Sequence, residues 1–151
     1  MSDLWPNDIG APGKIKSPVV ILKEVAAALG QKTRNILLGK VENSDSWVPK
    51  MGFNYKFYIV APALNNYRFL LFEIEHTINL YPLIVIPDES ILNELRNESR
   101  DIKIDQLNVR FEKYNVIYVG SEEEFLKALE AITKSKKTRQ VIQSLLSQIE
   151  R

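Results

Sequence analysis

The chain has 151 residues, of which 45% are hydrophobic and 26% charged, as in an average globular domain. Its formal net charge of +1 excludes a general electrostatic preference of the whole molecule for polyanions. The absence of cysteine excludes disulfides, thiolate metal sites and cysteine nucleophiles, and it suits a reducing compartment. The sequence shows neither a signal-peptide pattern nor an apolar run long enough to span a bilayer. We therefore expect a cytoplasmic protein with no membrane contact.

Residues 1–17 contain prolines and glycines but no hydrophobic periodicity, which predicts an extended N-terminal arm. Residues 18–151 are predicted to form a single α+β domain. Leu4, Trp5 and Ile9 can pin the arm to that domain, and we expect Trp5 to fill a groove on its surface. The alternative is that Trp5 belongs to a docking motif for another protein.

The first helix is predicted over residues 18–30, where apolar side chains recur on one helical face. Ser17 is expected to cap its first turn, with Pro18 at the first helical position. Gly30 is expected to end the helix in a left-handed conformation.

The later elements are predicted from alternating or continuous apolar runs, turn residues and capping signals. In chain order they are strands over 36–42, 53–61, 67–77 and 80–86, a helix capped by Asp88, a strand over 116–119, a helix that opens with the capping box Ser121–Glu124, and a last helix after a break at 134–137. The Asn65-Asn66 turn joins the two central runs into an antiparallel hairpin. Residues 102–111 alternate weakly, which is compatible with a further edge strand.

The predicted fold class is α+β, a single domain with an N-terminal helix, a mainly antiparallel sheet and two C-terminal helices. The order strand, helix, strand between residues 80 and 119 suggests one right-handed parallel crossover within that sheet. The two C-terminal helices each have an apolar face. These faces consist of Phe125, Leu126, Leu129 and Ile132 on the first, and Val141, Ile142, Leu145, Leu146 and Ile149 on the second.

The common catalytic motifs are missing from this sequence. It has no nucleophile elbow, no phosphate-binding loop and no dinucleotide-binding glycine pattern, and one histidine leaves little room for a Ser-His-Asp triad. We therefore expect neither a cofactor nor an enzyme. Glu73 and Glu75 would share one face of a strand and could hold a divalent cation, while His76 would point the other way. The alternative for the two carboxylates is a solvated strand end.

The order of elements, from the first helix through three antiparallel strands to a helix and a strand, resembles the core of restriction-type nucleases. That resemblance implies an acid on the second core strand and Glu-x-Lys on the third, with metal held by the carboxylates. Here the second strand offers Lys56 and no acid, and the third reads Glu73-Ile74-Glu75. The expected lysine is missing from its place, so the resemblance rests on element order alone.

Two groups of cations are candidates for binding nucleic acid or another anion. Lys56 and Arg68 accompany the aromatic side chains of the hairpin, which could stack bases if exposed or fill the core if buried. A second cluster, at the start of the last helix, consists of Lys134, Lys136, Lys137 and Arg139. A phosphate could bind there at the free amides of the helix start, and the alternative is a solvated surface.

The leading functional hypothesis is a non-catalytic domain that works by protein–protein contact, either as a homo-oligomer or as an accessory to another protein. Its expected contact surfaces are Trp5 in the arm and the apolar face of the last helix, unless that helix packs fully on its own domain. The alternative hypothesis is a nucleic-acid-associated protein with a restriction-nuclease-like core and an absent or degenerate metal site.

Overall fold

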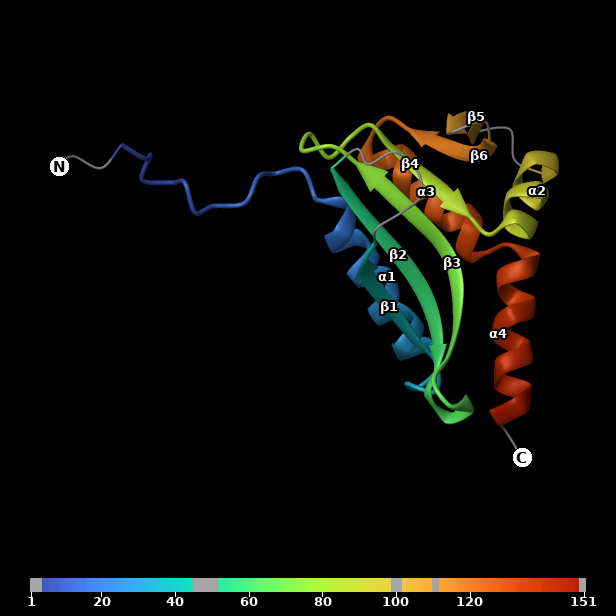
Figure 1. The fold of residues 1–151 in the computed structure, drawn as a ribbon. Helices are drawn as coiled ribbons and strands as arrows, with labels where there is room; N and C mark the ends of the chain where they lie inside the picture. The colour runs from blue at the N-terminus through green and yellow to red at the C-terminus, as the bar shows by residue number, and fades with distance from the viewer. Residues whose placement is uncertain (1–3, 45–51, 99–101, 110–111, 150–151) are drawn as a thin grey trace.

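The computed structural model describes residues 4–44, 52–98, 102–109 and 112–149 (Figure 1). Within these ranges, six strands form one antiparallel sheet in the order β1-β2-β3-β4-β6-β5. The strands are β1 (Leu38–Asn43), β2 (Phe53–Ala61), β3 (Tyr67–His76), β4 (Leu83–Pro87), β5 (Lys103–Val109) and β6 (Glu112–Val119). The helices are α1 (Pro18–Lys32), α2 (Glu89–Glu98), α3 (Glu122–Thr133) and α4 (Lys136–Ile149), with a 3₁₀ turn, η1, at Pro62–Leu64.

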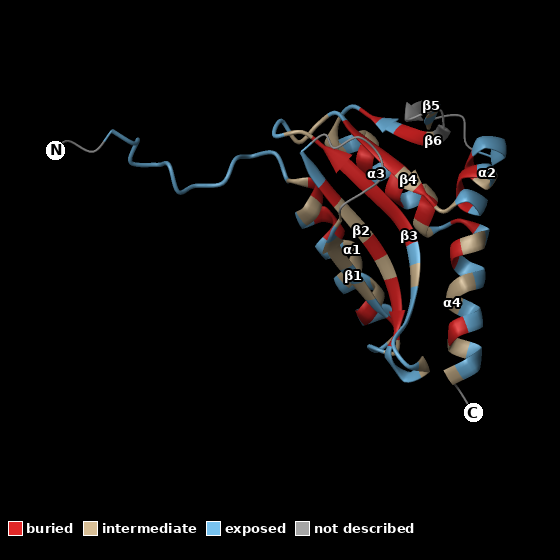
Figure 2. Ribbon diagram, viewed as in Figure 1, coloured by how far each residue is buried: buried red, intermediate tan, exposed pale blue. Residues whose placement is uncertain are grey.

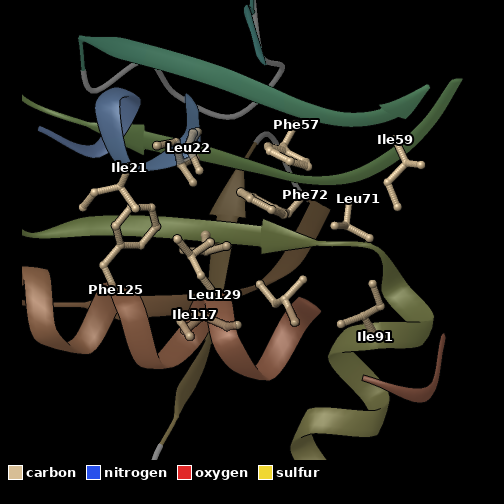
Figure 3. Close-up of a cluster of buried hydrophobic side chains, with 14 of the residues drawn as sticks. Ile21, Leu22, Phe57, Ile59, Leu71, Phe72, Ile91, Ile117, Phe125 and Leu129 are labelled. Atoms are coloured by element: carbon tan, nitrogen blue, oxygen red, sulfur yellow. The ribbon is translucent and has the colours of Figure 1, made fainter. Parts of the chain in front are cut away.

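The helices share one hydrophobic core with a single face of the sheet. Figure 3 shows Ile21 and Leu22 of α1 and Phe125 of α3 gathered with side chains from the strands. At its centre the rings of Phe57 on β2 and Phe72 on β3 stack with their centroids 5.1 Å apart. The α+β class, the N-terminal helix, the mainly antiparallel sheet and the two C-terminal helices are therefore confirmed. None of the helices in the described ranges is long and apolar enough to cross a membrane.

The N-terminal helix begins where predicted but is capped differently. Pro18 takes the first helical position, yet the Ser17 hydroxyl makes no capping hydrogen bond with the described part of the helix. The helix continues past Gly30 to Lys32, and the chain turns only at Arg34 and Asn35, which have positive φ. The Asn35 amide donates to the Gly30 carbonyl at 2.7 Å, so these two residues provide the left-handed turn that was expected of Gly30.

The central hairpin is confirmed. Strands β2 and β3 pair antiparallel from Phe53 opposite His76 to Ala61 opposite Tyr67. They are joined by η1 and by Asn65 and Asn66, both at φ 58°, a left-handed conformation that asparagine tolerates better than most residues.

The predicted parallel crossover is wrong. Strand β4 pairs with β6 antiparallel, with Val85 opposite Ile117. The reason is that the segment after α2 forms a full edge strand, β5, which pairs antiparallel with β6 and reverses the chain once more before β6 meets β4. Strand β4 also begins at Leu83, since Leu80 lies in a turn with φ 72°. The further edge strand is confirmed over Lys103–Val109, and residues 110 and 111 lie outside the described residues.

The two C-terminal helices are joined by a short buried turn. The predicted serine cap of α3 is present, with the Glu124 amide donating to Ser121 Oγ at 3.2 Å, and Glu124 reaches back to accept from the Ser121 hydroxyl at 3.4 Å. At the junction with α4, the buried Thr138 hydroxyl donates to the Ile132 carbonyl at 2.7 Å and accepts from Ser135 Oγ at 2.9 Å. This network holds α4 at a defined angle to α3.

Candidate functional site

The face of the sheet opposite the helices carries charged side chains on its first three strands. Cross-strand neighbours lie side by side in an antiparallel sheet, and here they are of opposite charge. Lys56 Nζ on β2 lies 3.6 Å from Glu73 Oε1 on β3, its register partner. Arg68 on β3 forms an ion pair with Glu42 on β1 and stacks over the ring of Tyr58, 3.9 Å from its centroid. The hydrogen bond from Arg68 lowers the pKa of the Glu42 carboxyl, so that pair stays charged at neutral pH.

Glu73 and Glu75 lie on one face, as period two predicts, but the alternative of a solvated strand end is wrong. Glu73 is 4% exposed and Glu75 is fully buried. Their neighbours on β2 contact them: Lys56 pairs with Glu73, and the Asn54 side-chain amide, in the orientation that turns its nitrogen toward Glu75, donates to Glu75 Oε1 at 3.1 Å. The counter-charge of Glu73 and the hydrogen bond to Glu75 Oε1 thus come from the chain itself. No group of three metal-ligating side chains exists among the described residues.

His76 lies on the other face of β3, next to the core, as predicted. Its ring stacks with Phe53 and Tyr55 at centroid distances of 5.2 and 6.0 Å. Its Nδ1 lies 2.7 Å from the Thr77 carbonyl, which can only accept, so Nδ1 carries the proton. The strand separates this imidazole from both carboxylates, so His76 is not placed to exchange protons with them.

The basic cluster at the start of α4 already has an anion beside it. The carboxylate of Glu94 on α2 accepts hydrogen bonds from the backbone amides of Lys136 (2.7 Å) and Lys137 (3.1 Å). The Lys136 ammonium pairs with Glu98 and that of Lys134 with Glu130, while Arg139 is exposed. The phosphate position expected at this helix start is therefore filled by a side chain of the same domain.

The apolar face of α4 packs mainly on its own domain. Leu145 is buried, and the remaining members are partly buried against the common core, namely Val141, Ile142, Leu146 and Ile149. A depression of about 430 Å³ separates part of α4 from the start of β3, where Tyr67 and Phe69 lie opposite Gln140 and Ser144. The apolar face of α4 is thus mostly covered by its own domain, and polar residues of the helix line the depression beside it.

The N-terminal arm, defined here as residues 4–16, is exposed at every position and projects away from the body (Figure 2). The exposed fractions are 88% for Leu4, 69% for Trp5, 61% for Ile9 and 61% for Ile15. The expectation that Trp5 fills a groove on its own domain is therefore wrong. At the root of the arm, the Lys16 amide donates to Glu122 Oε1 at 3.1 Å, and the Lys16 ammonium pairs with Glu24 at 2.9 Å.

A groove runs between α1 and α3, and we call it the α1–α3 groove. One part, of about 310 Å³, begins at Lys16 and continues along Val25, Ala28 and Leu126. A second part, of about 450 Å³, shares those three residues and extends to the far ends of both helices. Its floor is apolar and consists of Phe57, Ile59 and Leu71.

The sequence did not predict this groove, and the burial expected for one residue that lines it was wrong. Leu126 was predicted in the apolar face of α3 together with Phe125 and Leu129, which are buried, but Leu126 is 47% exposed and lines the groove. Helical periodicity places Leu126 beside Phe125 and Leu129 without saying which neighbour covers each, so no signal in the sequence marks the groove. The exposed Ile15 could have been found as a further apolar residue of the arm.

In comparisons with known proteins, no protein-family model matches the chain, and neither a curated protein nor a solved structure matches it. The candidate functional surfaces of this chain are therefore the arm, the groove and the charged sheet face.

Proposed function

We propose that this chain is a non-catalytic protein–protein interaction domain and that its N-terminal arm is the segment that binds the partner. One observation carries the proposal: Leu4, Trp5 and Ile9 are 88%, 69% and 61% exposed, in an arm that projects from the folded body. The cysteine-free composition suits the cytoplasm, which we propose as its compartment.

Burial against a partner would stabilise these exposed apolar side chains. Full burial of one large apolar side chain is worth about 1.5–3 kcal/mol, and an exposed arm leaves that free energy unused. Tryptophan is also the residue type most enriched among interface positions that dominate binding. A short segment with Leu4 and Trp5 side by side, followed by Pro6, presents a stiff apolar ligand.

The charged sheet face supports the alternative of nucleic-acid binding less well. Lys56 and Arg68, the two candidate cations on this face, each pair with a carboxylate of the same domain. Phe57 and Phe72 are buried in the core and cannot stack bases. Binding at this face would require breaking internal ion pairs before any phosphate is contacted.

The test is photo-crosslinking in the native cell from the arm. Trp5 is replaced by p-benzoylphenylalanine, and a control chain carries the same group at Lys127, whose side chain is 62% exposed on α3. We expect a discrete protein adduct from position 5 that the control position lacks. Adducts of equal yield and pattern from both positions would contradict the proposal.

A further inference from the structure

We propose that the α1–α3 groove of one copy receives the N-terminal arm of a second copy, so that two chains exchange arms in a two-fold dimer. This inference rests on the proposed function, because it names the partner of the arm as this same chain. It assigns the groove, which sequence reasoning did not detect, as the receptor.

The groove suits an apolar segment in size and lining. Its two parts, of about 310 and 450 Å³, each fall in the range of about 300–1,000 Å³ typical of binding pockets. The helix that forms one wall has 15 residues and is about 22 Å long at 1.5 Å per residue. In the free chain the arm contains two turns, in which the Ile9 amide donates to the Pro6 carbonyl and the Ala11 amide to the Asp8 carbonyl. Once extended, about seven residues would span the length of the helix, so Leu4, Trp5 and Ile9 can occupy one groove together when the arm straightens on binding.

The charges of the arm and the groove are complementary. From Leu4 to Gly13 the arm carries a single charged side chain, Asp8. The far end of the groove is bordered by Lys32 and Lys134 and by one acid, Glu130, which pairs with Lys134. This end therefore has an excess positive charge, and a lysine there is available to an aspartate that enters with the arm.

The root of the arm favours exchange between copies over return to the same domain. Lys16 bridges α1 and α3 at the near end of the groove, through Glu24 and Glu122 respectively. The chain before Lys16 leaves the body at this point and points away from it (Figure 1). Each copy thus presents a projecting arm and an open groove at once.

Reciprocity strengthens such a contact. In a two-fold dimer the arm of each chain meets the groove of the other, so both contacts form together. The second contact forms within an already associated pair, so it costs no further translational entropy. Two modest arm–groove contacts then hold one dimer.

The test uses full-length chains and measures mass by light scattering after size exclusion over a range of concentrations. Ala28 and Ala27 are adjacent, exposed residues of α1, but only Ala28 lines the groove. We expect dimers for the wild type and Ala27→Glu, and folded monomers for Ala28→Glu and Trp5→Ala. A glutamate in the groove opposes burial of an apolar arm and weakens association at least about tenfold.

A mixing experiment then identifies the two contacting surfaces. The Trp5→Ala chain keeps an intact groove and the Ala28→Glu chain keeps an intact arm, so only a mixture can form one arm–groove contact. We expect fluorescently labelled Ala28→Glu chain to bind the Trp5→Ala chain at least about tenfold more tightly than it binds itself.

Three results would overturn the exchange. The first is a wild-type chain that stays monomeric at all concentrations. The second is a dimer that persists in both Ala28→Glu and Trp5→Ala, and the third is an Ala27→Glu chain that loses dimerisation as fully as Ala28→Glu. A monomer in which Ala28→Glu alters the tryptophan fluorescence of a Trp47→Phe chain, which keeps only Trp5, would instead place the arm in its own groove. A monomer whose position-5 adduct is another protein would remove the second copy as partner and leave the proposed function standing.

Discussion

The carboxylate of Glu94 caps α4 from a distance of 42 residues in the chain, since it accepts the backbone amide of Lys136 at 2.7 Å. It also accepts the amide of Lys137, so two of the free amides at the start of α4 are satisfied by one side chain of α2. This contact links α2 to the start of α4, where the positive charges of Lys134, Lys136, Lys137 and Arg139 are concentrated.

Replacing Glu94 by alanine should therefore destabilise the fold. The lost cap and the lost anion at the helix start predict a decrease of about 1–2 kcal/mol in the free energy of unfolding, measured by urea denaturation. Glu98→Ala is the matched control, because it removes only an exposed ion pair with the Lys136 ammonium and should change stability by less than about 0.5 kcal/mol. Equal effects of the two substitutions would show that Glu94 does not cap the helix.

The hydroxyl of Thr138 should stabilise the fold through its two buried hydrogen bonds. Thr138→Val keeps the shape but removes a donor to the Ile132 carbonyl and an acceptor for Ser135 Oγ, all within a buried junction. We expect a loss of about 1–3 kcal/mol in denaturant unfolding. Thr133→Val, where the hydroxyl bonds an exposed carbonyl of the same helix, should stay within about 0.5 kcal/mol of the wild type. A smaller loss for Thr138→Val than for Thr133→Val would contradict the network.

Gly39 should not tolerate a side chain, because α1 approaches β1 closely there. A Cβ at Gly39 would lie 2.5 Å from the Ala26 Cα and 2.7 Å from the Ala26 Cβ. Gly39→Ala therefore forces α1 away from the sheet and should lower stability by about 1–3 kcal/mol in thermal or denaturant unfolding. Gly13→Ala, with no atom within 4 Å of the added Cβ, is the control and should leave the folded body unchanged.

Tyr81 should make stability fall at alkaline pH. Burial raises its pKa to about 12, with a further contribution from the nearby charge of Glu122, whereas an unfolded tyrosine ionises near 10.0. Between these values the unfolded chain releases a proton that the folded chain retains, so unfolding becomes easier as pH rises.

Tyr81→Phe should remove this part of the pH dependence. Denaturation from pH 8 to 11 should show the variant losing less stability than the wild type above pH 10, with a constant difference below pH 9. Since the Tyr81 hydroxyl has no hydrogen-bond partner among the described residues, phenylalanine should not be destabilising at neutral pH. Parallel curves over the whole range would contradict a buried, protonated phenol.

Much of the local structure follows from the sequence alone. The capping box at Ser121 and Glu124, the Asn65-Asn66 turn and the alternating runs of the hairpin all depend on groups a few residues apart. Such short-range patterns specify an element whatever surrounds it, which is why the α+β class and the central hairpin were predicted correctly.

Contacts between distant segments were decided only by the tertiary structure. The pairing of β4 with β6 depends on whether residues 103–109 form a strand, and a weak alternation does not determine that. The burial of Glu75 depends on its neighbours across the sheet, and the anion at the start of α4 comes from Glu94 on another helix.

The candidate site divides in the same way. The sequence by itself determined that Leu4, Trp5 and Ile9 lie in a segment without periodicity, because a helix or strand would need a regular apolar pattern. Only the tertiary structure decided that this arm stays exposed and that α1 and α3 leave a groove with Ala28 in its wall. A groove is the space between elements brought together by the core, and no local run of residues encodes its position.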